Sequence, residues 1–200
     1  MSKRWLAERK NDYYYKKAKK MDYRSRAAFK LKQIDDRFHI LRKGARVVDL
    51  GAAPGGWLQV AREVVGPSGK VVGLDMQSIE PIDDVIVIRG DIREEETVNE
   101  LFSQIGGKVD VVLSDMSPHI SGSYSMDHAR SVELCHHGLV FASKVLKKRG
   151  CMVMKIFQGD MMQDFLAEVR KHFGEVRLHG PKASRSSSSE IYIIAKGFLG

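Results

Sequence analysis

The sequence has few of the features that mark secreted or membrane proteins. It holds two cysteines, Cys135 and Cys151, which are too few for a disulfide framework and lack C-x-x-C spacing. No apolar run approaches the roughly 18 residues of a transmembrane helix. The charged N-terminus also lacks the apolar stretch of a signal peptide. These absences predict a protein of the reducing cytoplasm that has no membrane partner.

Acidic residues are scarce in the N-terminal quarter of the chain. Residues 1–46 hold 16 of the 33 Lys and Arg residues but only 5 of the 25 Asp and Glu residues, so they carry the whole excess of a net charge of +8. Four tyrosines are interleaved with this charge: Tyr13, Tyr14, Tyr15 and Tyr23. Basic and aromatic residues together suit a polyanion whose bases can stack, although a solvated tail would have the same composition. We interpret residues 1–20 as a basic N-terminal arm and residues 21–200 as a single domain.

Strand-like and helix-like patterns alternate from residue 45 onward. Short apolar runs predict strands at 45–50, 70–75, 85–90, 109–115, 151–157, 175–180 and 190–197. Helical patterns are found at 22–38, 56–65, 94–105, 127–147 and 160–173. The alternation predicts an α/β fold, with a mostly parallel sheet and helices on both faces. Because no helix separates the last two strands, we expect one antiparallel strand at the end.

One strand-like run, CMVMKIFQGD at residues 151–160, contains a lysine among apolar residues. Burying an unpaired ammonium group is costly. Lys155 therefore needs either a buried partner or an edge position with its stem on apolar surface and its charge in water. Glu190, at the start of the last predicted strand, also has two interpretations. It could be a functional carboxylate, or a charge at the start of a strand that discourages aggregation.

A glycine-rich turn follows the first predicted strand. The segment VVDLGAAPGGW (47–57) has the spacing G-x-x-x-G-G, which differs from the G-x-G-x-x-G of dinucleotide folds and from a P-loop. Asp75 ends the second strand, where a carboxylate can bind a ribose diol, and Asp91 follows the third, within reach of an adenine amino group. The pattern predicts a nucleoside-containing cofactor, and a tight turn with ordinary strand-end caps is the structural alternative.

Four segments together resemble the FtsJ/RrmJ (RlmE) family of S-adenosylmethionine-dependent RNA ribose 2′-O-methyltransferases. They are DLGAAPGGW (49–57), SDMSP (114–118), VMKIFQG (153–159) and SRSSSSEIYIIA (184–195). The resemblance extends from about Lys20 to Gly197. It implies the Rossmann-like class I methyltransferase fold, with a seven-stranded sheet whose last strand is antiparallel, and S-adenosyl-L-methionine as cofactor.

The resemblance places the family's catalytic Lys-Asp-Lys-Glu set at Lys30, Asp115, Lys155 and Glu190. A neutral Lys155 could take the proton of the ribose hydroxyl, whereas a charged Lys155 could steer the hydroxyl and stabilise the developing alkoxide. Lys30 would orient the ribose or an adjacent phosphate. Asp115 and Glu190 would hold the two lysines in place.

The family's cofactor contacts fall at Gly55, Trp57, Asp75, Asp91 and Asp115. Trp57 has a second interpretation, because it could instead fill the interface between a helix and the sheet. No metal site is expected. The run Cys135, His136 and His137 consists of neighbours that point in different directions on a helix, and no second cluster accompanies it.

The resemblance implies ribosomal RNA as the substrate, specifically a uridine of the large subunit, and we expect a monomer. A tRNA or mRNA-cap ribose methyltransferase would need the same four catalytic residues. A non-catalytic RNA-binding factor of ribosome assembly could retain the fold, but it would have no evident use for two buried lysines. A nicotinamide-dependent reductase is disfavoured by the glycine spacing.

Overall fold

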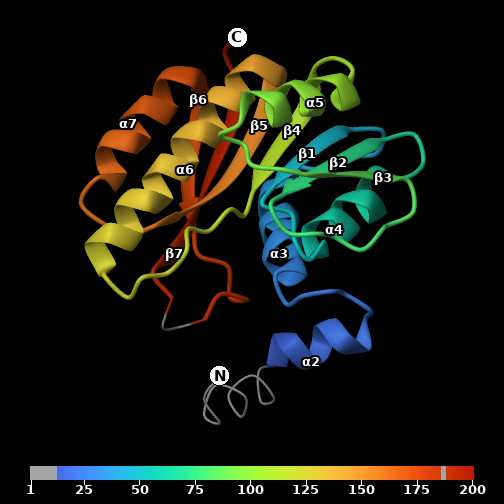
Figure 1. The fold of residues 1–200 in the computed structure, drawn as a ribbon, viewed down its shortest axis with the longest axis horizontal. Coiled ribbons are helices and arrows are strands. Elements are labelled where there is room, and N and C mark those ends of the chain that lie inside the picture. The colour runs from blue at the N-terminus through green and yellow to red at the C-terminus, as the bar shows by residue number, and fades with distance from the viewer. Residues whose placement is uncertain (1–12, 186–187) are drawn as a thin grey trace.

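The protein, described here by a computed structural model over residues 13–185 and 188–200, has one seven-stranded sheet between two layers of helices (Figure 1). The strands are β1 (Arg46–Leu50), β2 (Lys70–Asp75), β3 (Val85–Arg89), β4 (Val109–Ser114), β5 (Leu146–Phe157), β6 (Phe173–His179) and β7 (Glu190–Phe198). The helices are α2 (Tyr13–Lys20), α3 (Ala28–Phe38), α4 (Gly56–Val65), α5 (Glu95–Ile105), α6 (Tyr124–Val145) and α7 (Met162–His172). None of these helices is long and apolar enough to cross a bilayer.

The strand order is β3-β2-β1-β4-β5-β7-β6. Strands β1 to β5 pair in parallel, whereas β7 is antiparallel to both of its neighbours, β5 and β6. The predicted α/β class and the single reversed strand are therefore confirmed. The carboxyl ends of β1, β2, β4 and β5 lie at one edge of the sheet, where such folds bind their ligands.

Alternate residues of each strand face the two helical layers. In β1, Val48 and Leu50 belong to the apolar cluster formed with α5, α6 and α7, whereas Val47 belongs to the cluster formed with α2, α3 and α4. Both faces of the sheet are thus covered. This is the reason that the strands are recognisable in the sequence as nearly continuous apolar runs.

The helix predicted from residue 22 begins only at Ala28. Asp22 has a positive φ of 58°, and the Arg24 guanidinium donates to three backbone carbonyl oxygens of the loops after β1 and β2, at 2.5–3.3 Å. These long-range bonds hold residues 22–27 in turns, although their apolar spacing is helical. The predicted helix start at residue 22 was wrong, because the spacing of apolar residues gives no information about such long-range hydrogen bonds.

The long helix and the strand after it also differ from their predicted bounds. α6 begins at Tyr124 and ends at Val145, and β5 begins at Leu146 instead of residue 151. Leu146 pairs with Val109 of β4 before a shift in register. Backbone pairing therefore extends β5 through three exposed polar residues that have no strand-like pattern. The other predicted elements agree with the structure to within two residues at each end.

The predicted basic arm falls partly on residues 1–12, which lie outside the described residues. Its remainder forms α2, which Figure 1 shows beyond α3 at one end of the domain. α2 is held to α3 by the buried Ala18 and by the ring of Tyr14, whose centroid is 5.7 Å from that of Phe29. The division of the chain at residue 20 stays a prediction.

A carboxylic acid in β1 is the most deeply buried ionisable group of this strand. Asp49 has no exposed surface, and neither of its carboxyl oxygens has a hydrogen-bond partner among the described residues. Burial, together with the nearby carboxylates of Asp115 and Asp75, holds the pKa of Asp49 well above its usual range. A proton on Asp49 removes most of the cost of burying it.

We expect Asp49→Asn to change how stability depends on pH. Because the pKa of Asp49 is raised, the folded state keeps a proton that the unfolded state loses, so the wild-type free energy of unfolding falls as pH rises above the ordinary carboxyl range. One proton changes that free energy by at most about 1.4 kcal/mol per pH unit. Melting temperatures of both proteins between about pH 4 and pH 7 should therefore diverge in favour of the variant. A difference in melting temperature that does not change with pH would contradict a raised pKa of Asp49.

Candidate active site

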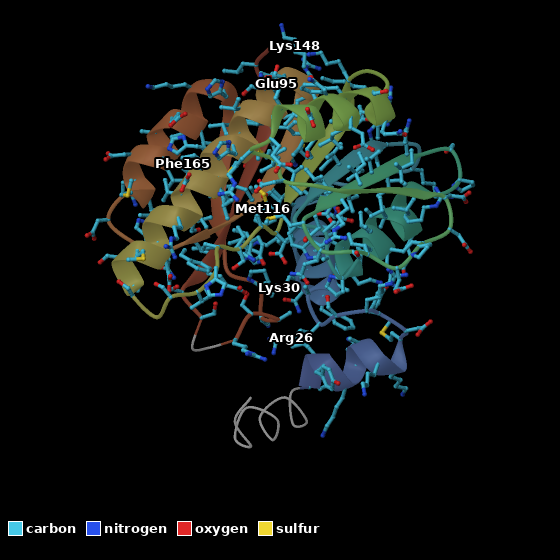
Figure 2. All side chains as sticks on the ribbon, viewed as in Figure 1. Arg26, Lys30, Glu95, Met116, Lys148 and Phe165 are labelled. Carbon is cyan, nitrogen blue, oxygen red and sulfur yellow. The ribbon has the colours of Figure 1, made fainter. Side chains whose placement is uncertain are left out.

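Two cavities open at the carboxyl edge of the sheet. The larger has a volume of about 740 Å³ and the smaller about 240 Å³. In Figure 2, Met116, Lys30 and Arg26 follow one another in that spatial order, from the centre of the domain toward the end where α2 lies. Met116 lines the smaller cavity, and both Lys30 and Arg26 line the larger one.

The glycine-rich turn forms one wall of the smaller cavity. Gly51 has φ +75°, and a Cβ atom there would lie 2.7 Å from the backbone of Met116, so glycine alone permits this close approach between two loops. Asp75 is fixed beside it, because its two carboxylate oxygens accept from the backbone N–H groups of Ala53 at 2.9 Å and Gln77 at 2.8 Å. The turn and the end of β2 therefore form one rigid wall.

Asp91 also lines the smaller cavity, but its carboxylate is shared with an arginine. Arg93 contacts it with two side-chain nitrogens at 2.5 and 3.0 Å. The hydrogen bond from Arg93 outweighs burial and lowers the pKa of Asp91. Asp91 is therefore held ionised, as an acceptor that faces the cavity beside a cation.

The five predicted cofactor contacts separate into two groups. Asp75, Asp91 and Asp115 line the smaller cavity, whereas Gly55 and Trp57 are not among the described residues that line it. Gly55 is the buried N-cap of α4. The Trp57 indole is 3% exposed and donates its N–H to the carbonyl oxygen of residue 27 at 2.8 Å. The indole thus lies between α3 and the sheet, and direct contact of Gly55 and Trp57 with a cofactor stays a prediction.

Lys155 has buried partners. Its Nζ lies 3.2 Å from Oδ1 of Asp115 and donates to the Asp115 backbone oxygen at 2.7 Å. The Lys155 residue is only 8% exposed. An ammonium group at this depth is stable only when it is paired and hydrogen-bonded. The alternative of an edge lysine with its charge in water is therefore excluded by the geometry.

Lys30 and Glu190 form a second ion pair, with Nζ 2.5 Å from Oε1 and side chains that are 12% and 11% exposed. Burial by itself would raise the pKa of Glu190, but the positive charge of Lys30, with a smaller contribution from that of Lys155, lowers it overall. Both partners line the larger cavity. All four residues of the predicted catalytic set are therefore in ion pairs at this edge of the sheet.

Tyr192 joins the two ion pairs, and sequence reasoning missed it. Its hydroxyl donates to Oδ1 of Asp115 at 2.8 Å, and Nζ of Lys30 lies 5.8 Å from its ring centroid. Burial raises the pKa of Tyr192 well above its usual range, with further contributions from Asp115 and Glu190, so the hydroxyl stays a donor. A signal was available, since Tyr192 lies two residues after Glu190 on one strand face and is paired with Lys155 across β5 and β7.

The Cys-His-His run on α6 does not converge on one point. The Cys135 thiol lies 3.1 Å from the Lys155 backbone oxygen, inside the core. His136 instead faces Glu168 on α7, at 3.3 Å. These side chains serve packing and helix contact, and Cys135 supports the strand that carries Lys155.

The arrangement places charged groups at the boundary between two binding spaces. Asp115 lines the smaller cavity, and Lys30 and Glu190 line the larger. Lys155 and Tyr192 connect them through Asp115. Such a site can hold one molecule in each cavity and stabilise charge, or move a proton, where the two meet.

Comparisons with known proteins agree with this geometry. The chain matches the family model of FtsJ-like methyltransferases over residues 23–198. It is 51% identical over 194 residues to a Methanothrix thermoacetophila protein named Ribosomal RNA large subunit methyltransferase E. The aligned region covers 97% of this chain and 75% of the relative. A Methanocaldococcus jannaschii protein of the same name is 50% identical, with 99% and 83% covered.

A solved structure supports the same grouping. A candidate ribosomal RNA methyltransferase from Plasmodium falciparum is 29% identical, with a TM-score of 0.79 over 89% of this chain and 100% of that one. The family match includes the glycine-rich turn, both lysines of the ion pairs and the reversed strand. This chain therefore belongs to the family of FtsJ-like methyltransferases.

Proposed function

We propose that this protein transfers a methyl group from S-adenosylmethionine to the ribose 2′-hydroxyl of a uridine in large-subunit ribosomal RNA. The observation that carries the proposal is the set of paired charges between the two cavities, where a methyl donor and a hydroxyl would have to meet. The names of the two archaeal relatives point to the same class of RNA.

The smaller cavity fits the cofactor by the chemistry of its lining. S-adenosylmethionine supplies a methyl group on a positively charged sulfur atom. Asp75, Asp91 and Asp115 offer carboxylate acceptors, which suit the hydroxyl and amino groups of that molecule. Gly51 keeps the loop backbone free of a side chain at the same wall. Gly55 and Trp57 would support this loop from behind, through the start of α4.

Lys155 would act on the ribose oxygen, which gains the methyl group and loses its proton. A charged Lys155 would donate a hydrogen bond to that oxygen and stabilise its negative charge, and the hydroxyl proton would then leave to solvent. A neutral Lys155 instead accepts the proton. The bonds to Asp115 fix the position of Nζ in both cases. The pH profile of kcat separates the two roles, because only a neutral base requires turnover to rise as the lysine loses its own proton.

Lys30 would position the substrate in the larger cavity. Glu190 is ionised at neutral pH, because its pKa is lowered by Lys30 despite the effect of burial. Glu190 therefore serves as an anchor for Lys30 and is a poor proton acceptor. Lys30, held at the inner part of the cavity, can donate to the ribose or to an adjacent phosphate.

We also infer that the chain acts as a monomer in the cytoplasm, with residues 1–20 as a basic arm on a methyltransferase domain at 21–200. The described part of the arm supports this role. Its helix α2 lies at the end of the domain that carries Arg26 and Lys30, and its residues Lys16, Lys19 and Lys20 are exposed (Figure 2). Exposed lysines at that position would add affinity for the RNA backbone.

The proposed function is tested by transfer of labelled methyl groups to unmodified large ribosomal subunits and to tRNA. We expect alkali-resistant label in the large-subunit RNA. Label confined to tRNA would assign the activity to another RNA. No label in either RNA, with the cofactor still bound, would favour an RNA-binding factor without catalysis.

Replacement of Lys155 by Met should lower kcat by roughly 10²- to 10⁴-fold, because the group that acts on the ribose oxygen is lost. Lys196→Met provides a matched control. Lys196 is a half-buried lysine of the neighbouring strand β7, and its Nζ donates to the carbonyl oxygen of Phe38 at 2.9 Å, away from both cavities. Equal kcat values for Lys155→Met and wild type would exclude the proposed role of Lys155.

Gly51→Ala should weaken S-adenosylmethionine binding by roughly 5- to 150-fold, the range expected when an added methyl group displaces packed backbone. Gly66→Ala is the control, because Gly66 also has a positive φ, of 65°, but a Cβ there meets nothing within 4 Å. Calorimetric titration of the cofactor measures both variants. Equal affinities would show that the close approach of Gly51 to Met116 does not shape the cofactor site.

RNA affinity should depend on salt through the lysines of α2. For the double variant Lys19→Gln/Lys20→Gln, we expect the slope of log K against log salt concentration to decrease by about 0.7 for each lysine that contacts phosphate. Lys148→Gln/Lys171→Gln is the control of equal charge. Lys148 lies at the opposite end of the domain from Arg26 and Lys30 (Figure 2). Identical slopes for the two double variants would contradict a role of α2 in RNA binding.

A further inference from the structure

The larger cavity has two unlike walls. One part of the lining, here called the cationic wall, contains Arg26, Arg185 and the serines before β7, and another part, here called the apolar wall, contains Ile120, Tyr124 and Phe157. Both arginines line this cavity, and burial, followed by repulsion from the charge of Arg185, lowers the pKa of Arg26. A nucleotide has the same division, with an anionic phosphate on one side of its ribose and a flat apolar base on the other.

Tyr124 is the aromatic residue on the exposed rim of the apolar wall. It is 61% exposed and occupies the first position of α6. A single exposed aromatic side chain is ordinary. Here, however, the hydroxyl donates to the Gln158 carbonyl oxygen at 2.6 Å. The ring is therefore held at one end by the backbone of α6 and at the other by this bond. A flat apolar surface is thus kept in place at the cavity.

The loop that precedes Tyr124 is also fixed. The buried carboxylate of Asp127 accepts from the Ser121 N–H and hydroxyl at 2.8 and 2.7 Å, and from the Gly122 N–H at 3.1 Å. These bonds, first that from the Ser121 backbone, lower the pKa of Asp127. The turn at 121–122 therefore keeps Ile120 and Tyr124 on the same wall of the cavity.

His128 ties the same end of α6 to the strand that carries Lys155. Its Nδ1 lies 2.9 Å from the Phe157 carbonyl oxygen, and its Nε2 accepts from the Met161 N–H at 3.1 Å. Tyr124 and Lys155 thus stand in a fixed relation, because both are connected to the segment at the end of β5. A base held by Tyr124 would place its ribose in a defined position relative to the catalytic groups.

We propose that Tyr124 stacks on the base of the nucleotide that is methylated, and so positions its ribose at Lys30 and Lys155. The inference rests on the proposed function and adds to it a substrate-binding residue for the RNA base. Stacking tolerates any base, because each has a π-face. Tyr124 therefore contributes binding and orientation, and it does not select the uridine by hydrogen bonds. The guanidinium group of Arg185, and that of Arg26 beside its bond to the Ala183 carbonyl oxygen, would lie toward the adjoining phosphates.

The test uses steady-state methylation of unmodified large-subunit ribosomal RNA by the full-length protein. For Tyr124→Ala we expect kcat/KM for RNA to fall by roughly 5- to 150-fold, the effect of losing one stacked base. Most of the change should lie in KM. Tyr124→Phe keeps the ring but loses the bond to the Gln158 carbonyl oxygen that restrains it, so its loss should be clearly smaller than that of Tyr124→Ala. Tyr124→Leu keeps apolar bulk without a π-face and should resemble Tyr124→Ala.

The matched control is Met126→Ala, because Met126 is 47% exposed two residues further along α6 and is not among the described residues lining the cavity. Melting temperature and S-adenosylmethionine affinity should be unchanged in every variant, which separates loss of stacking from loss of folding. Activity of Tyr124→Leu equal to wild type would overturn the inference, as would a loss in Tyr124→Phe as large as in Tyr124→Ala. In both cases wild-type methylation of RNA would leave the proposed function intact, whereas its absence would overturn both.

Discussion

The buried ion pair between Lys155 and Asp115 is the interaction on which the rest of the site depends. The ammonium group has little contact with water, so the free energy of folding includes the cost of its desolvation. That cost is offset only while β4 and β5 end side by side, in the register that pairs Ser114 with Met154. A slip of one residue would turn Lys155 to the other face of the sheet. The charge therefore couples the register of the central strands to the geometry of the site.

The reversed strand β7 completes the site for a topological reason. Glu190 is the first residue of β7 and is paired with Phe157, the last residue of β5. In a strand parallel to β5, the first residue would lie at the opposite edge of the sheet, far from Lys30 and Lys155. Antiparallel pairing brings the beginning of β7 to the carboxyl ends of the other strands. It also places Tyr192 opposite Lys155, where its hydroxyl reaches Asp115.

The positive charge of the N-terminal quarter serves two different purposes. Arg24 holds the loops after β1 and β2 through three carbonyl oxygens, and Lys32 pairs with Glu63 of α4 at 3.3 Å. These cations are structural. The exposed lysines of α2 carry charge at the surface, and Arg26, which donates to the Ala183 carbonyl oxygen, lines the larger cavity together with Arg185. Net charge alone does not distinguish these groups, because it does not show which side chains have internal partners.

The sequence by itself determined the α/β class, the glycine-rich turn, the reversed last strand and the position of the four charged residues, because these follow from local periodicity and from short motifs. Only the tertiary structure decided the partners. Trp57 lies under the sheet through a bond to a carbonyl 30 residues away, and Tyr192 joins the site through Asp115, 77 residues away. The helix start at Ala28 and the position of Tyr124 at the larger cavity also depend on contacts between segments that are distant along the chain. Contacts between segments distant along the chain leave no periodic signal, since they are set by how the layers pack.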